Sequence, residues 1–294
     1  MVKIILDTDL GRDCDDAGAL ALLHTLASEG NAQILAITLC TSAISSAITV
    51  KAINEWYERP DIPIGKYTKK EFLEEEICQR FTKPIMEKYL KNNREPVFED
   101  AVKVLRKSLA ENDDVTIAVI GMQNNIADLI RSMPDDISPL NGRELIEKSV
   151  KNIYVMGGNF VDSEYKEYNI VSDVKSAKYV SENCPVPIIY CGFELGVNIK
   201  SGTTLVNTSD ENPVKYSYVK HCTKERIPHF SWDPITVYCS VCQESDLYKL
   251  SEKLKISFDD EARTIINGKG KDCFLIADSS DAEIQLIIDG LIKG

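Results

Sequence analysis

Ten residues near the N-terminus carry the most information about this chain: Asp7-Thr8-Asp9-Leu10-Gly11-Arg12-Asp13-Cys14-Asp15-Asp16. They hold five carboxylates, follow the apolar run of residues 3–6 directly, and lead into residues 15–29, whose leucines recur at helical spacing. The order strand, acidic loop, helix places the loop at the carboxyl end of a strand. Open α/β sheets bind their ligands beyond such ends, so we expect a binding site here.

The charge of this acidic loop predicts a metal ion. Five negative charges so close together repel one another unless a cation compensates them, and oxygen ligands suit calcium or magnesium rather than a soft metal. Asp13, Asp15 or Asp16 can instead cap the helix and favour its dipole, but capping does not account for all five carboxylates. A phosphoryl-transfer loop fits less well, because Gly11-Arg12 departs from it and the sequence has no Gly-x-x-x-x-Gly-Lys phosphate loop.

The remaining chain alternates apolar runs with helical patterns. Five runs are apolar throughout, as in parallel strands that are covered on both faces: residues 3–6, 33–39, 115–120, 153–156 and 186–191. Apolar residues at helical spacing predict helices over residues 15–29, 47–57, 101–110 and 126–133. This alternation predicts an α/β fold with an open, mostly parallel sheet and helices on both faces. No linker interrupts the pattern, so we expect one domain over residues 1–294, with the charged residues 66–98 crossing the rim of the site.

Composition narrows the class of partner. The formal net charge of -12 argues against nucleic acid, because phosphate binding needs clustered Lys and Arg; it suits cations and neutral small molecules, or simply keeps the protein dispersed. Nine cysteines form no disulfide framework, and Met1-Val2-Lys3 runs directly into the first apolar segment. We therefore expect free thiols in a reducing cytoplasm, with no leader and no membrane span. Cys239 and Cys242 have CxxC spacing but no second pair, so we expect core thiols there rather than a zinc or redox site.

Several segments match, in order, the motifs of one family. The acidic loop is similar to Asp-x-Asp-x-Gly-x-Asp-Asp, through Asp7, Asp9, Gly11, Asp15 and Asp16, with two extra residues before the final pair. Further along, Ile120-Gly121-Met122-Gln123-Asn124-Asn125-Ile126-Ala127 is similar to the family's Gly-Pro-Leu-Thr-Asn-Leu-Ala, and Val155-Met156-Gly157-Gly158 matches its Met-Gly-Gly. Glu167-Tyr168-Asn169, followed by Asp173, is similar to its Glu-Phe-Asn…Asp. Near the C-terminus, Ser231-Trp232-Asp233-Pro234 corresponds to its His-Asp-Pro. Together they resemble the nucleoside hydrolase family over most of the chain.

This resemblance implies a calcium site and a general base. The side chains of Asp9 and Asp16 correspond to calcium ligands, Asp233 adds a carboxylate from the far end of the chain, and Ile120 adds its backbone carbonyl. Asp9 also corresponds to the base that takes a proton from the attacking water. The chemistry is coherent, since a divalent cation lowers the pKa of water and carboxylates stabilise the oxocarbenium-like state of N-glycosidic cleavage.

The resemblance also implies contacts with the substrate. Asn169 and either Asp15 or Asp13, which lies in the insertion, correspond to residues that hold ribose hydroxyls. Glu167 corresponds to a contact on the 5′ side of the sugar. Asn159, directly after the Met-Gly-Gly motif, is a further expected substrate contact.

Two departures from the family pattern concern the substrate. Ala43 stands where the family often has an asparagine that contacts ribose, and Trp232 replaces a histidine that protonates the leaving base in some members. Trp232 either stacks on the substrate or belongs to the core. His229, one helical turn before Asp233, is a candidate for reaching the pocket, whereas His24 is expected to be a surface or core residue. Because the family includes members that act on modified nucleosides such as queuosine, such a substrate is a candidate here.

We therefore expect a calcium-dependent enzyme that hydrolyses a ribonucleoside to free base and ribose. It is expected to form a homo-oligomer, a dimer or tetramer, with a small-molecule substrate and neither nucleic acid nor membrane as a partner. The alternative is a protein of the same fold that binds calcium and a ribosyl ligand without catalysis, which Ala43 and the missing histidine favour. The enzyme is favoured by five residues that match the family pattern: Asp9, Asp16, Asp233, Asn169 and Glu167. A hydrolase of a different ribosyl compound is a third interpretation.

Overall fold

The computed structural model describes residues 1–69, 79–222 and 227–293, and within them a nine-stranded sheet forms the centre of the molecule. The strand order is β10-β13-β7-β6-β5-β1-β2-β3-β4. Neighbours run parallel except for the antiparallel pair β10 and β13. The strands are β1 (Val2–Thr8), β2 (Ala32–Leu39), β3 (Ile64–Lys66), β4 (Glu99–Asp100), β5 (Val115–Val119), β6 (Val150–Met156), β7 (Ile188–Cys191), β10 (Tyr248–Leu250) and β13 (Cys273–Ala277).

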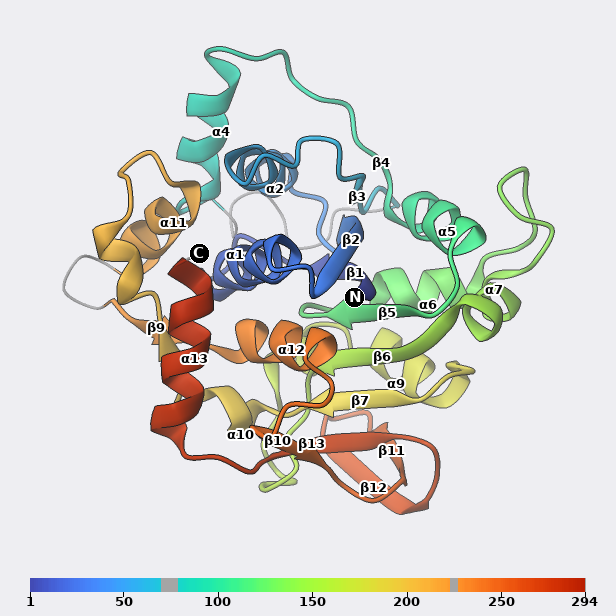
Figure 1. The fold of residues 1–294 in the computed structure, drawn as a ribbon. Coiled ribbons are helices and arrows are strands. Elements are labelled where there is room, and N and C mark those ends of the chain that lie inside the picture. The colour runs from blue at the N-terminus through green and yellow to red at the C-terminus, as the bar shows by residue number, and fades with distance from the viewer. Residues whose placement is uncertain (70–78, 223–226, 294) are drawn as a thin grey trace.

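Helices cover both faces of this sheet, and each face has its own buried apolar cluster (Figure 1). One side carries α1 (Asp15–Ser28), α2 (Ile44–Trp56), α11 (Pro213–Cys222), α12 (Trp232–Val241) and α13 (Asp281–Lys293). The other side carries α5 (Ala101–Glu111), α6 (Asn124–Arg131), α7 (Gly142–Ser149) and α9 (Val174–Asn183). The smaller elements are α4 (Thr82–Leu90), α8 (Tyr168–Ser172), α10 (Phe193–Gly196), the 3-10 turn η1 (Thr204–Asn207), and two short antiparallel pairs, β8 (Lys200–Ser201) with β9 (His229–Phe230) and β11 (Leu254–Phe258) with β12 (Thr264–Lys269).

Helix α1 shows why the acidic loop is held firmly. Its residues from Asp15 to His24 are all buried, because the sheet covers one side of the helix and α12 and α13 cover the other. A helix that is apolar around most of its circumference is stable only when it is enclosed in this way. The helix start, and with it the end of the acidic loop, is therefore fixed by the core.

The path of the chain creates a crevice between β1 and β5. After β1 the chain winds outward through β2, β3 and β4, then returns to pair β5 with the other edge of β1 and continues through β6 and β7. The connection that follows β1 therefore leads toward one edge of the sheet, and the connection that follows β5 leads toward the other edge. Open α/β sheets bind ligands at such a switch point, beyond the carboxyl ends of the strands.

The predicted fold class is confirmed, and the five predicted strands and four predicted helices are present with small shifts at their ends. The antiparallel β10, the pair β11 and β12, and α13 were not among the elements predicted from the sequence. Cys239 is a buried free thiol inside α12, and Cys242 is a free thiol at its end. Of the helices that the structure describes, none combines the length and the apolar character needed to cross a membrane.

Candidate active site

A pocket of about 260 Å³ opens at the carboxyl edge of the sheet, at the crevice between β1 and β5. Each central strand contributes one residue at or just after its end: Asp9 after β1, Ile120 after β5, Met156 at the end of β6 and Phe193 after β7. Small-molecule sites combine such a concave surface with a few convergent polar groups. The remaining lining residues are Arg12, Asp13, Asp15, Tyr165, Glu167, Tyr168, Asn169, Trp232 and Asp233.

The first aspartate of the acidic loop has a structural role. Asp7 is fully buried in β1, where its Oδ1 accepts hydrogen bonds from the Thr38 hydroxyl and from Nδ2 of Asn125 at 2.7 Å. The backbone N–H of Ile120 donates to the Asp7 carbonyl at 2.8 Å. Asp7 therefore ties the ends of β1, β2 and β5 together beneath the pocket.

Four other carboxylates converge beside the pocket. One oxygen each from Asp13, Asp15, Asp16 and Asp233 lies within 4.8 Å of the others. Two hydrogen bonds hold the group: the backbone N–H of Asp233 donates to Oδ2 of Asp15 at 3.2 Å, and the Thr8 hydroxyl donates to Asp16. The structure thus brings the predicted ligands Asp16 and Asp233 together across more than 200 residues of sequence.

Burial and mutual repulsion raise the pKa of most of these carboxyl groups, as expected where carboxylates gather to bind a cation. Burial, and then repulsion among neighbouring carboxylates, raises the pKa of Asp15, Asp16 and Asp233. Burial and the charge of Asp13 raise the pKa of Asp9 to about 8. For Asp13 itself, burial also acts to raise the pKa, but contacts with His229 and Asp15 outweigh it and lower the pKa to about 2. A divalent cation reverses the repulsion, because a positive charge stabilises every ionised carboxylate around it.

Asp9 and Ile120, the two other predicted ligands, line the pocket but are not part of the group of four. Gly121 keeps this corner open, since a Cβ at that position would lie 2.8 Å from Oδ1 of Asp9. A larger residue would push the aspartate away from the wall. Asp9 therefore stays in the pocket wall.

Glu167 and Asn169 also line the pocket. Glu167 caps α8: its carboxylate accepts the backbone N–H groups of Asn169 at 2.8 Å, Ile170 at 3.2 Å and Gly158 at 3.4 Å. Burial raises its pKa to about 7 despite these bonds. The amide of Asn169 donates to the Met156 carbonyl at 3.3 Å and lies 3.4 Å from the Ile120 carbonyl. Gly158, at a φ of +81°, allows the turn that brings β6 to this loop.

Aromatic rings form the remaining wall. Phe193 stacks on Tyr165 with centroids 4.4 Å apart and on Trp232 with centroids 5.3 Å apart. The indole N–H of Trp232 donates to the Phe193 carbonyl at 2.9 Å. On the other side, the Arg12 guanidinium lies 3.5 Å above the ring centre of Tyr168. These aromatic groups suit a planar or apolar part of a ligand.

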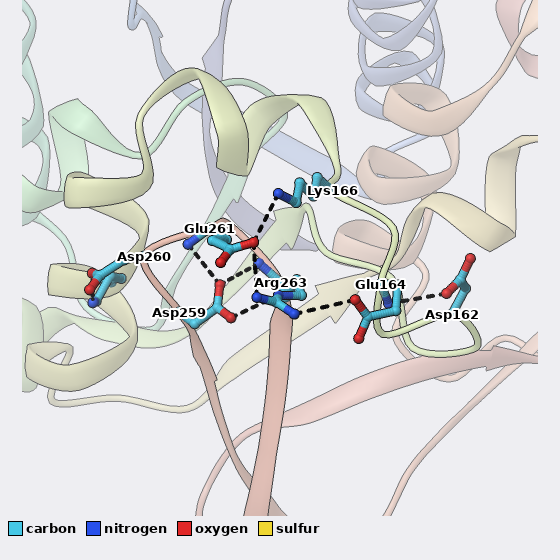
Figure 2. A network of polar contacts seen from close by, with 8 residues as sticks. Asp162, Glu164, Lys166, Asp259, Asp260, Glu261 and Arg263 are labelled. Carbon is cyan, nitrogen blue, oxygen red and sulfur yellow. Dashed lines mark hydrogen bonds and ion pairs between the residues drawn. The ribbon is translucent and has the colours of Figure 1, made fainter.

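The loop of residues 159–167, which carries Tyr165 and Glu167, is held by the β11–β12 hairpin (Figure 2). Figure 2 shows Arg263 between the two segments, with ion pairs to Glu164 at 3.3 Å and to Glu261 at 2.9 Å. Lys166 contacts Glu261 at 3.2 Å. Each exposed pair contributes little alone, but the network orients one rim of the pocket.

Asn159 does not line the pocket. Its Oδ1 accepts the backbone N–H groups of Val161 at 3.0 Å and Asp162 at 2.8 Å, while its own N–H donates to the Thr264 hydroxyl at 3.0 Å. The side chain therefore shapes the rim loop, and the structure does not bring it to the other predicted substrate contacts.

Two histidines differ in their surroundings. His229 lies outside the pocket lining, with Nε2 3.9 Å from Oδ2 of Asp13. His24 is fully buried, 2.9 Å from Oδ1 of Asn54 and stacked on Tyr57, in agreement with a structural role. Ala43 is buried at the start of α2.

The segment of residues 66–99 contributes no described residue to the pocket lining. Its helix α4 packs on α2, and residues 70–78 lie outside the described part of the chain. The sequence assigned no pocket role to Arg12, Tyr165, Tyr168 or Phe193. Two of them lie inside recognised motifs: Arg12 in the acidic loop, and Tyr168 between Glu167 and Asn169. Their place in those motifs could have indicated that they line the pocket.

Comparisons with known proteins agree with this geometry. A model of the family described as inosine-uridine preferring nucleoside hydrolase matches residues 4–267. The crystal structure of an inosine-uridine preferring nucleoside hydrolase from Bacillus anthracis has a TM-score of 0.74 at 15% identity, with 100% of this chain and 99% of that chain covered. An inosine-guanosine nucleoside hydrolase has a TM-score of 0.74 at 17% identity, covering 99% and 98% of the two chains. The type III effector protein XopQ, solved with adenosine diphosphate ribose, has a TM-score of 0.72 at 12% identity, covering 99% and 93%.

These structural likenesses show a shared fold, and the family match extends over most of the sequence. No curated protein matched the sequence. The chain belongs to the nucleoside hydrolase family and is an N-ribohydrolase, an enzyme that hydrolyses N-glycosidic bonds.

Proposed function

We propose that this N-ribohydrolase acts on a ribonucleoside, that it depends on calcium, and that Asp9 is its general base. The observation that carries the proposal is the carboxylate of Asp9 in the pocket wall next to the convergent group Asp13, Asp15, Asp16 and Asp233. The donor set fits the ion, since it consists of hard carboxylate oxygens, mostly buried and mutually repelling. Asp9, Asp16, Asp233 and the Ile120 carbonyl would hold it, with Asp13 or Asp15 completing the shell.

Calcium in this position would supply a positive charge that lowers the pKa of the attacking water and binds hydroxyl oxygens of the sugar. In the presence of that charge the Asp9 carboxyl ionises at neutral pH. Its carboxylate then accepts the proton that the water loses on attacking the anomeric carbon. Such a base typically contributes about 100- to 10,000-fold to the rate.

The sugar is held by the polar side of the pocket. Asp15 or Asp13 and Asn169 accept or donate hydrogen bonds at the vicinal hydroxyls, and Glu167 faces the 5′ side. Asp15, Glu167 and Asn169 are buried, and the positions of Glu167 and Asn169 are fixed by the backbone bonds of Glu167 and the contacts of Asn169. The negative charges around the ring also stabilise the positive charge that develops on it.

The leaving base is placed against the aromatic wall of Tyr165, Phe193 and Trp232. The described pocket lining contains no histidine to protonate the base. The substrate must therefore carry a base that leaves readily or that stacking makes more basic, which supports a narrow range and makes a modified nucleoside a candidate. Common purine nucleosides are expected to be poor substrates.

The test is a ribose-release screen over natural and modified nucleosides with the wild type, Asp9→Asn and a matched control, Asp61→Asn, at an exposed turn. We expect turnover by the wild type and the control, and a loss of about 100- to 10,000-fold in Asp9→Asn, whose thermal melt should still show a folded protein. Full turnover in a folded Asp9→Asn would show that another group takes the proton. If the wild type binds nucleoside in calorimetry but releases no ribose from any of them, the non-catalytic alternative holds.

Three further expectations stay predictions: a single domain over residues 1–294, a homo-oligomer, and a cytoplasmic location. The first is supported by a sheet that contains both β1 and β13. Light scattering of the purified chain tests the second, and microscopy of the tagged protein in its source cells tests the third.

A further inference from the structure

One thiol and two imidazoles meet next to the carboxylate group, outside the pocket lining, and a second thiol lies beside the first. Cys14 is the residue before α1, His221 and Cys222 end α11, and His229 begins β9. A sulfur or nitrogen atom from each of Cys14, His221 and His229 lies within 4.8 Å of the other two. The sulfur of Cys222 lies 3.7 Å from that of Cys14. Three separate segments of the chain therefore converge on one point.

The imidazoles at this point have unused polar atoms. Nδ1 of His221 and Nε2 of His229 are buried, and neither has a hydrogen-bond partner among the residues that the structure describes. The Asp13 oxygen near His229 is 3.9 Å from Nε2, which is too far for a hydrogen bond. A buried polar atom without a partner costs free energy that a bound ligand recovers.

We propose that Cys14, Cys222, His221 and His229 form a second metal site, which binds zinc. Two thiolates and two imidazoles are a ligand set that tetrahedral structural zinc commonly takes, and they suit a soft or borderline ion rather than calcium. With Zn–S bonds of about 2.3 Å, two sulfurs on one tetrahedral zinc lie about 3.8 Å apart. The Cys14–Cys222 separation of 3.7 Å matches that distance, whereas a disulfide needs about 2.05 Å.

The site would position the two-residue insertion of the acidic loop. Cys14 is flanked by Asp13 and Asp15, both members of the carboxylate group. A metal bond at Cys14 fixes the backbone between them to the end of α11 and the start of β9. The sulfur and nitrogen ligands of this site differ in chemistry from the oxygen ligands of the carboxylate group. Their role is to hold Asp13 and Asp15 in place.

Elemental analysis of the full chain tests the site without reference to catalysis. Protein purified without chelator from zinc-supplemented cells is expected to carry about one zinc per chain. The single variants Cys14→Ser and Cys222→Ser should lose most of it, and Cys242→Ser, at the end of α12, should retain it. Zinc in the wild type at well below one per chain, or zinc content unchanged in both site variants, overturns the proposal, whatever the nucleoside assay shows.

Cobalt provides a spectroscopic measurement that can be made on the wild-type chain. Metal-free wild type titrated with Co²⁺ should develop a thiolate-to-cobalt charge-transfer band in the near ultraviolet and the strong visible absorption of a tetrahedral ion, both reversed by zinc. The half-buried His221→Ala should weaken both bands. An octahedral spectrum without charge transfer, or an intact mass that lacks two hydrogens because Cys14 and Cys222 have joined in a disulfide, contradicts the site.

Discussion

Replacing Trp232 by alanine is expected to weaken binding of the base without weakening binding of the sugar. The indole ring packs on Phe193 at 5.3 Å, and its N–H donates to the Phe193 carbonyl at 2.9 Å. Losing the ring pairs with Phe193 and Phe230 costs about 1–3 kcal/mol, and losing the hydrogen bond costs about 1 kcal/mol. We therefore expect the free energy of unfolding to fall by about 2–4 kcal/mol, which leaves a domain of ordinary stability folded.

The effect on the substrate should be larger than the effect on ribose. A lost stacking contact with a base is worth about 1–3 kcal/mol, so KM for the best nucleoside should rise about 5- to 150-fold, at about 1.4 kcal/mol per tenfold. The inhibition constant of free ribose, which has no base, should barely change. Initial rates of ribose release at varied nucleoside, repeated with added ribose, give both constants.

Two variants serve as controls. Trp232→Phe keeps an aromatic face but loses the N–H donor, and should recover most of the nucleoside affinity. Trp56→Ala, at the partly exposed end of α2, should change neither constant. Equal increases for nucleoside and ribose would place the indole at the sugar, and a chain that unfolds at the assay temperature would make Trp232 a core residue; either result refutes the reasoning.

The other predictions concern the sugar, the ion and pH. Because buried groups that bind a hydroxyl are left unpaired by its absence, kcat/KM for a 2′-deoxyribonucleoside should be far below that of the matched ribonucleoside, and equal values would show that the sugar pocket is misassigned. Removing calcium with a calcium-selective chelator should lower Tm as well as activity, since saturation at about 1,000 times Kd is worth about 4 kcal/mol; a Tm that does not move on calcium addition contradicts the ion site. Burial lowers the pKa of His24 from 6.5 to about 4, so the unfolded state binds the proton first as pH falls. Its contribution to stability is fully present above pH 6.5 and is lost between pH 6.5 and 4, by about 3 kcal/mol, and urea titrations of His24→Phe should show a shallower decline over that interval than the wild type.

The acidic loop of the site could be predicted from the sequence because its carboxylates are close together in the chain. Asp9, Asp13, Asp15 and Asp16 crowd one loop, and repulsion between carboxylates is visible in the order of residues alone. The same holds for the parallel sheet, whose buried strands read as continuous apolar runs. Asp233 was found only through a resemblance, since nothing near it in the sequence indicates that it reaches the acidic loop.

The aromatic wall and the rim could not be predicted in this way. Tyr165 and Phe193 lie in loops or very short elements, where no periodicity indicates which side chain faces a cavity. Asn159 followed a recognised motif, yet its amide serves a turn, because the choice between turn and ligand depends on the path of the next three residues. The cluster of Cys14, Cys222 and both histidines also depends on tertiary contacts, and the sequence directed attention to Cys239 and Cys242 instead.

The hydrogen bond between the Asp233 backbone and Asp15 joins residues 218 positions apart, and this has a consequence during synthesis. At about 5–20 residues per second, a ribosome needs roughly 10–45 s to make Asp233 after Asp15. The hairpin that orients the rim loop follows later still. For that interval the acidic loop lacks its distant partner, so a fragment that ends before residue 233 contains only three of the four convergent carboxylates.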